Sequence, residues 1–487
     1  MVRTAFISLV VAVAACGQPS ARSHGPNAPV DETGGAGGKS ATGGAAGGAA
    51  GGNPGSGGSP GPSPDAAGPG SGGSAPPADA APPPDLAPPD PNNLVWPNEV
   101  SSKNSDPWLV ENHTKIVEMH PRFLIIDFAN GFTDAQVMAR FNLHKQALME
   151  GSRYHGYSNP ESKPFMIWEV FKHVSLKDDP VPTDPMAPPN SSKMPRRNGG
   201  IDFGKLFTQE YADLYRVPDP ASPGRYLKIC DMFNAGMVND ILVAFVKKAP
   251  DNNVPEVVEM HQVYDATTTM KVPSKFDPNA GNGSWGPGDV ELVAACGRSV
   301  RLNFLEMTGN LTNAMEVLGH NFEHIASRTM PAFYAQWKPF ANMEMRARYG
   351  TMFNDWYGIC QYGMPCLTFP DNNSVVYPGG GMIKPYDQGC GNAHFPPNAT
   401  RHYDKANPSE VLSTCEHYGL HDGPDGKDLQ TPYSFKTLDR WKDNPVAKAM
   451  PGGAWFLYWW QSWPGYGNKA TTPDGTPMKN WWVYLYY

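Results

Sequence analysis

The sequence predicts an α/β fold: a mostly parallel sheet with flanking helices, followed by an irregular, disulfide-pinned, aromatic-rich C-terminal region. Three observations lead to this fold class. Short apolar runs typical of buried strands alternate with helical patterns between residues 122 and 327, as in chains built from β-α-β units. After about residue 350 these patterns give way to glycine, proline, asparagine and aromatic residues. Cysteines in that loop-rich part then favour disulfides that hold it against the core.

The first strand of the core is the apolar run RFLIIDF at 122–128. Thr133 and Gln136 follow with the spacing of a capping box, which predicts a helix that ends before Gly151. Further strands are expected at 164–171, 240–246, 256–265 and 299–305, a loop at 180–200, and helices near 205–216 and at about 311–327. Helical connections between strands are what a parallel sheet requires.

The first sixteen residues resemble the leader of a bacterial lipoprotein. Arg3 precedes an apolar run that is too short to span a bilayer and that ends in small residues. The run closes with Val13-Ala14-Ala15-Cys16, which resembles a lipobox. The resemblance implies that Cys16 is lipidated and becomes the mature N-terminus, and Gly17 after it implies sorting to the outer membrane. The alternative is an ordinary signal peptide with a chance cysteine.

Residues 17–92 are rich in glycine, alanine, serine and proline and hold few bulky apolar side chains. Such a segment cannot bury enough apolar surface to offset the entropy of ordering, so the sequence predicts a disordered tether. The expected organisation is a signal peptide at 1–16, the tether at 17–92, an α/β core at 93–350 and the Cys- and Trp-rich region at 351–487, packed on the core.

Charge and missing motifs argue against several functions. The formal net charge of −8 is unlike the basic excess of nucleic-acid-binding domains, so no nucleic-acid partner is expected. The expected folded part has no G-x-S-x-G elbow, and the chain has no Walker loop and no G-x-G-x-x-G after a strand. The sequence therefore does not favour a function as a serine hydrolase, an NTPase or a dinucleotide-binding protein.

Six cysteines remain once Cys16 is assigned to the leader, and an even number in an exported chain favours disulfides. Cys360–Cys366 and Cys390–Cys415 would close short loops, which leaves Cys230 for Cys296. Thiolate metal binding is the alternative, although the chain has no C-x-x-C pair.

The expected helix at 311–327 has two different faces. Its apolar stripe consists of Leu311, Met315, Leu318, Phe322 and Ile325, and its opposite face carries Glu316, His320 and Glu323, with His324 at the edge. One interpretation is that this polar face is exposed to solvent. The other is that it forms a metal site, because imidazoles and carboxylates one turn apart can converge on one ion. The cofactor would be zinc or another divalent metal.

The string His320-Asn321-Phe322-Glu323-His324 resembles the H-x-x-E-H motif of inverzincin metallopeptidases. The resemblance implies that His320 and His324 bind zinc and that Glu323 is the catalytic general base. A distant carboxylate would complete the shell, and Glu344 is one downstream choice. In a second hypothesis, Glu316, His320 and Glu323 bind the metal and the site has no peptidase activity.

A second polar cluster lies in the loop sequence at 390–422, between two cysteines. His394, Asn398 and Tyr403 are its candidate substrate-binding residues, because a disulfide would hold such a loop in place. His394, beside Phe395 and a Pro-Pro pair, is also the preferred donor of a missing metal ligand. The alternative is a surface loop without a binding role.

The segment GAWFLYWWQSWPGYG at 453–467 holds Trp455, Trp459, Trp460 and Trp463. Aromatic residues at this density are expected in the core. An exposed row of tryptophans would instead stack on sugar rings.

The sequence thus favours an exported lipoprotein at the cell envelope, on the outer membrane or cell surface, with metal-dependent hydrolysis as the leading function. A cell-wall component or polysaccharide is the expected substrate. The alternative is a non-catalytic cell-surface or carbohydrate-binding protein, and the residues leave open whether the chain is an enzyme. The globular part resembles uncharacterised secreted bacterial proteins, a resemblance that implies no activity.

Overall fold

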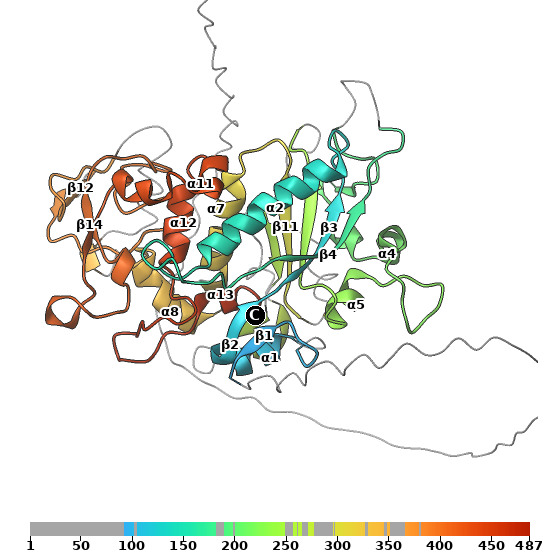
Figure 1. Cartoon of the computed structure of the whole chain (residues 1–487), viewed down its shortest axis with the longest axis horizontal. Helices are drawn as coiled ribbons and strands as arrows, with labels where there is room; N and C mark the ends of the chain where they lie inside the picture. Colours follow the sequence, from blue (N-terminus) through green and yellow to red (C-terminus); the bar gives the residue numbers. More distant parts are fainter. Residues whose placement is uncertain are drawn as a thin grey trace, which may run out of the picture. The chain divides into compact units, whose positions relative to one another are not determined.

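The computed structural model describes residues 92–487 except 102–104, 182–188, 198–199, 249–256, 261, 265–270, 277–295, 297, 327–329, 345–347, 351–365 and 379–380 (Figure 1). At 105–107, 197, 200, 257–260, 262–264, 271–276, 324 and 331 it describes the backbone alone. The chain divides into units Met1–Pro83 and Pro84–Tyr487. The expected signal peptide, Cys16 and nearly all of the tether lie outside the described residues. Within those residues, no helix has the length and apolar character needed to cross a membrane.

A five-stranded sheet forms the centre of the second unit, in the order β4-β3-β7-β11-β8. Its strands are β3 (Arg122–Asp127), β4 (Glu169–Ser175), β7 (Asp240–Phe245), β8 (Val257–Met260) and β11 (Val300–Glu306). Neighbours β4-β3, β3-β7 and β7-β11 are parallel, and only β8 runs antiparallel, along β11. The predicted mixed fold with a mostly parallel sheet is confirmed.

Helix α2 (Asp134–Gly151) covers one face of this sheet (Figure 1). The predicted capping box opens it: the Thr133 hydroxyl accepts from the Gln136 amide, and the Gln136 side chain accepts from the Thr133 amide. Phe123 and Ile125 of β3 pack on this side, in one cluster with Phe141.

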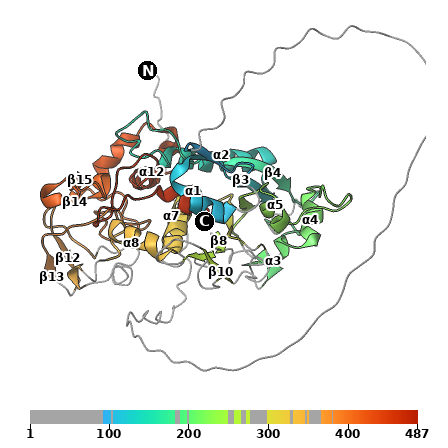
Figure 2. The same cartoon turned by 90° about the horizontal axis from the view of Figure 1, so that it is seen from below.

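The other face of the sheet packs against three short helices: α3 (Phe203–Leu206), α4 (Gln209–Tyr215) and α5 (Ile229–Asn234). Leu124 and Ile126 of β3 belong to this second cluster because successive side chains of a strand point to opposite faces. Figure 2 shows α2 on one side of the sheet and α3 and α4 on the other. The strands are therefore buried on both faces, as parallel sheets are.

Four expected elements differ from the structure. The loop expected at 180–200 ends in β5 (Arg196–Arg197), which pairs with β6 (Gly200–Ile201). The second strand begins at Glu169 rather than 164, because the segment around Met166 bridges to Met119 instead and leaves pairing with β3 to the residues that follow. The helix expected at 205–216 is two helices, because Thr208 takes an extended conformation between them. The run 256–265 is divided between β8 in the main sheet and β9 (Gln262–Tyr264), which pairs with β10 (Lys271–Phe276).

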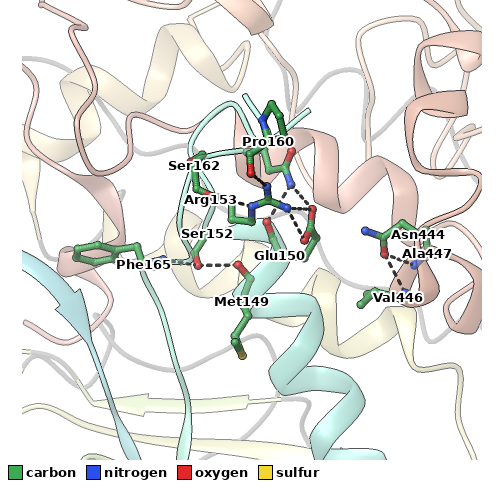
Figure 3. Close-up of polar contacts among 11 residues, drawn as sticks. Met149, Glu150, Ser152, Arg153, Pro160, Ser162, Phe165, Asn444, Val446 and Ala447 are labelled. Carbon is green, nitrogen blue, oxygen red and sulfur yellow. Dashed lines mark hydrogen bonds and ion pairs between the residues drawn. The ribbon is translucent and has the colours of Figure 1, made fainter. Parts of the chain in front are cut away.

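The C-terminal end of α2 is tied to the last part of the chain. Arg153 pairs with Glu150 at 3.0 Å and donates to the carbonyls of Ser162 and Pro160 (Figure 3). The Gln461 amide, at the end of α12 (Gly453–Gln461), donates to the Glu150 carbonyl at 2.9 Å. These contacts fix α12 against the α/β core.

The aromatic segment of α12 is core. Trp455, Trp459 and Trp463 are fully buried and Trp460 is 2% exposed. They pack with α7 (Thr312–His324), α8 (Pro331–Phe340) and α13 (Trp481–Tyr484); the Phe322 and Trp463 rings, for example, lie 4.2 Å apart. The core interpretation is confirmed, and these four tryptophans offer no exposed row for sugar stacking.

The remaining elements are short. They are β1 (Leu94–Trp96), α1 (Ser105–Asn112), β2 (Ile116–Met119), β5 (Arg196–Arg197), β6 (Gly200–Ile201), β12 (Val375–Tyr377), β13 (Gly381–Ile383), β14 (Val411–Ser413), β15 (Thr431–Tyr433) and α11 (Pro445–Ala449), with 3-10 turns η1 (His113–Lys115), η3 (Cys415–His417), η4 (Pro424–Gly426) and η5 (Phe435–Trp441). Asn444 caps α11 by accepting from the amides of Val446 and Ala447 (Figure 3).

Two of the three predicted cysteine pairs are confirmed. Cys230 pairs with Cys296, and Cys390 pairs with Cys415. Cys366 is disulfide-bonded as well, but its expected partner, Cys360, lies outside the described residues.

Candidate metal centre

Helix α7 has the two faces that its sequence predicts. Met315, Leu318 and Phe322 are at most 4% exposed and belong to the main core. On the opposite side, the Glu316 and His320 side chains are only 14% and 19% exposed. This polar face is therefore covered by protein rather than fully solvated.

The cover is the loop that follows Cys390. Asn392 shapes its start, because the Asn392 side-chain oxygen accepts from the backbone amide of His394 at 3.0 Å. The Tyr403 amide donates to the His394 carbonyl at 2.9 Å, which folds the loop back on itself. The Trp459 indole N–H, from the buried α12, donates to the Gly391 carbonyl at 3.1 Å. The core thus holds the loop above α7.

Three side chains converge where the loop meets the helix. The Nε2 atoms of His320 and His394 lie 3.0 Å apart. Glu316 Oε1 lies 3.0 Å from His394 Nε2 and 3.6 Å from His320 Nε2. Glu316, His320 and His394 therefore form a group of ligand atoms close enough to hold one metal ion.

Two further residues support these three. The Tyr403 hydroxyl donates to Glu316 Oε1 at 2.5 Å and lies 2.8 Å from His394 Nε2. Glu323 Oε2 lies 2.8 Å from His320 Nδ1, the ring nitrogen that does not face the cluster. A carboxylate at that nitrogen fixes the ring orientation and makes the other nitrogen more basic, as in carboxylate–histidine–zinc arrangements.

The charges of the cluster favour a cation. Burial works against a charged His320, but the Glu323 and Glu316 carboxylates outweigh it and raise the pKa of His320 to about 10. Burial likewise opposes ionisation of Glu316, yet hydrogen bonds with His320 and His394 hold the pKa of Glu316 well below its ordinary value. A positive charge is therefore stabilised between the two carboxylates, and a metal ion can replace the proton that provides it.

Lys405 is a functional candidate that the sequence did not reveal. Its ammonium lies 5.1 Å from the centre of the Tyr403 ring and 4.2 Å from that of Phe456. Burial lowers the pKa of Lys405 to about 8, although the Glu316 carboxylate acts in the opposite direction. Its position two residues after Tyr403 was the one sequence signal that could have found it.

The other residues expected at the site lie as follows. The Asn398 amide donates to the carbonyls of Asn407 and Ser409, so its described contacts lie within the loop. Glu344 pairs with Arg348 at 3.3 Å and lines a separate cavity of about 1010 Å³. The His324 side chain lies outside the described residues.

A second group with metal-ligand geometry consists of Asp127, Asp134 and His173. The Lys177 ammonium already lies between its two carboxylates, 2.8 Å from Asp127 and 2.6 Å from Asp134. This ammonium occupies the position of a metal ion and neutralises the carboxylates. We therefore interpret the group as an ion-pair network at the end of β3.

Comparison of the chain with protein-family models and with curated proteins found no match, so the chemistry of the candidate metal centre rests on its own residues.

Proposed function

We propose that Glu316, His320 and His394 bind one divalent ion, zinc by preference, and that the centre catalyses hydrolysis. The ligand spacing carries the proposal. Ligands about 2.0–2.1 Å from a tetrahedral zinc ion lie about 3.3 Å from one another. The three observed separations are 3.0, 3.0 and 3.6 Å. Two imidazoles and one carboxylate also match the ligand set of catalytic zinc sites, which leave the fourth position to water or substrate.

A metal at this centre would supply Lewis acidity and lower the pKa of a bound water to about 7. The residues of the chain have separate roles around it. Glu323 holds the His320 ring with Nε2 directed at the cluster. The Tyr403 hydroxyl donates its one proton to Glu316 Oε1 and so orients that carboxylate toward the cluster.

This assignment differs from the one that the inverzincin-like string implies. There Glu323 acts as general base and His324 is the second ligand. The Glu323 carboxylate lies against His320 Nδ1, across the ring from the converging atoms, which supports a positioning role. His394 then takes the place of the second histidine ligand.

We also propose that the chain is exported and tethered by lipid at Cys16. The lipobox-like Val13–Cys16 and the Gly/Pro-rich tether support this location. The pairs Cys230–Cys296 and Cys390–Cys415 fit it, because disulfides persist in oxidising compartments. A substrate of the cell wall or a surface polysaccharide would be within reach of such an anchor.

Metal content of the purified full chain, made without a histidine tag, tests the centre. After dialysis against zinc, elemental analysis should find one zinc per chain in the wild type and almost none in His320→Ala or His394→Ala. His417→Ala, which removes a histidine paired with Asp422 outside the cluster, is the matched control and should keep its zinc. A wild type without zinc, or variants that retain it, would contradict the proposal.

A further inference from the structure

A cavity of about 330 Å³ is lined by Lys405, the cation that packs on Tyr403 of the candidate metal centre. Lys405 lines this cavity, and its ammonium lies over the ring of Tyr403, whose hydroxyl reaches Glu316 and His394. On the other side, Gly452 of the cavity wall lies close to Thr312, the first residue of α7. Lys405 and Tyr403 therefore connect the cavity to the ligand cluster.

The wall of the cavity is largely apolar and aromatic. Trp441 and Trp455 are at most 3% exposed, whereas Phe435 is 45% exposed. Leu438 completes this apolar surface. The volume falls in the range of small-molecule sites, and the exposed Phe435 side chain favours an aromatic ring.

The charges of the wall are unequal. Lys405, Lys442 and Lys448 line it, against the single carboxylate of Asp439. Lys448 is partly neutralised by Asp443, at 3.2 Å outside the wall. Lys405 and Lys442 against Asp439 leave an excess of one positive charge next to apolar surface, which is complementary to an anion.

Lys405 is the residue best placed to bind that anion. Its side chain packs on Phe456 and Tyr403 and is only partly exposed, so its position is fixed. A carboxylate that binds a partly buried cation gains more than one that binds an exposed lysine, because water screens the pair less.

We propose that this cavity binds a small aromatic carboxylic acid, with its ring against the exposed Phe435 side chain and its carboxylate at Lys405. The position beside Tyr403 makes the cavity a specificity pocket for the proposed hydrolytic centre, so substrates or products would carry an acidic group next to an aromatic one. The specificity role rests on the proposed function, whereas binding of the acid does not.

The test compares 3-phenylpropionate with its neutral amide, 3-phenylpropionamide, by calorimetric titration of the full chain treated with chelator. The two probes have nearly equal size and differ in charge. The acid should bind at least about tenfold more tightly than the amide, because a charge-assisted hydrogen bond is lost with the amide. Lys405→Met should remove that preference, and Lys436→Met, an exposed neighbour that does not line the cavity, should retain it.

Equal affinities for acid and amide, or no binding of either at millimolar concentration, would overturn the proposal even if Lys405→Met failed to fold. Because these titrations use metal-free protein, they are independent of zinc binding. A chain that binds the acid but no zinc would keep the pocket and lose the metal centre. A chain that binds zinc but shows no preference for the acid would keep the centre and lose the pocket.

Discussion

The Nε2 atoms of His320 and His394 lie 3.0 Å apart, although 74 residues separate the two histidines in the chain. Two ring nitrogens at this distance need a proton or a metal ion between or beside them, since two lone pairs would otherwise face each other. Glu316 Oε1, within 3.6 Å of both, adds the negative charge that stabilises either one. The His320–His394 pair is therefore the position at which we propose that a metal ion binds.

Glu323→Gln should separate positioning from catalysis. If Glu323 orients His320, the substitution should weaken zinc affinity about 10- to 100-fold, the usual effect of losing an outer-shell partner. Competition with a chromophoric chelator measures that affinity. A general base would give a different result: zinc affinity close to that of the wild type, with hydrolysis lost once a substrate is found.

Gly319→Ala should disturb both packing and the metal centre. A Cβ atom at Gly319 would lie 2.6 Å from the Trp459 ring and 3.4 Å from Ala393, the neighbour of His394. We expect a loss of about 1–3 kcal/mol in the free energy of unfolding, as overpacked cores show, together with weaker zinc binding. Chemical denaturation and zinc titration measure the two effects. Gly131→Ala, with nothing within 4 Å of the added atom, should leave both unchanged.

The free energy of unfolding should fall as the pH drops below 6.5. Burial lowers the pKa of His113 and of His144 to about 3 in the folded protein. The unfolded chain therefore binds protons first, so the stability that is present above pH 6.5 is lost as the pH falls toward 3. The slope is at most about 1.4 kcal/mol per pH unit for each histidine.

Urea denaturation of the full chain at pH 7, 6 and 5 measures this slope. His144→Leu should make it shallower, and His417→Gln serves as the control at a partly exposed histidine. An identical slope in wild type and His144→Leu would show that His144 is not the source.

The Cys390–Cys415 disulfide should support the metal centre, because the loop that carries His394 and Tyr403 begins at Cys390. The double substitution Cys390→Ala, Cys415→Ala should cost about 2–5 kcal/mol of stability, typical of native disulfides, and reduce zinc affinity. Removing Cys230 and Cys296 should affect stability alone. Peptide mapping without reduction should recover both linked pairs, and free thiols at these four positions would contradict the export proposal.

Lipidation at Cys16 is tested by metabolic labelling with a palmitate analogue. The wild type should be labelled and Cys16→Ala should not. Equal labelling of the two chains would eliminate the lipoprotein assignment and leave an ordinary signal peptide as the alternative.

Elements with local sequence signals could be predicted before the fold was known. The Thr133–Gln136 capping box and the apolar runs of β3, β7 and β11 depend on neighbours a few residues away, and the structure confirms them. Helical spacing likewise placed Glu316 and His320 on one face, because 3.6 residues per turn align positions four apart. The pairing of Cys390 with Cys415, expected because it closes a short loop, is also confirmed.

The residues that pack against the polar face of α7 depend on long-range folding. Local spacing could raise His394 as a ligand donor but could not set its distance from His320, which depends on the Asn392 turn and on the buried Trp459 that anchors Gly391. Packing also determines that Glu323 contacts Nδ1 of His320 rather than Nε2. It likewise determines that Lys405 lies beside the Tyr403 ring. A loop has no periodicity that fixes its path, so contacts with the core must fix it.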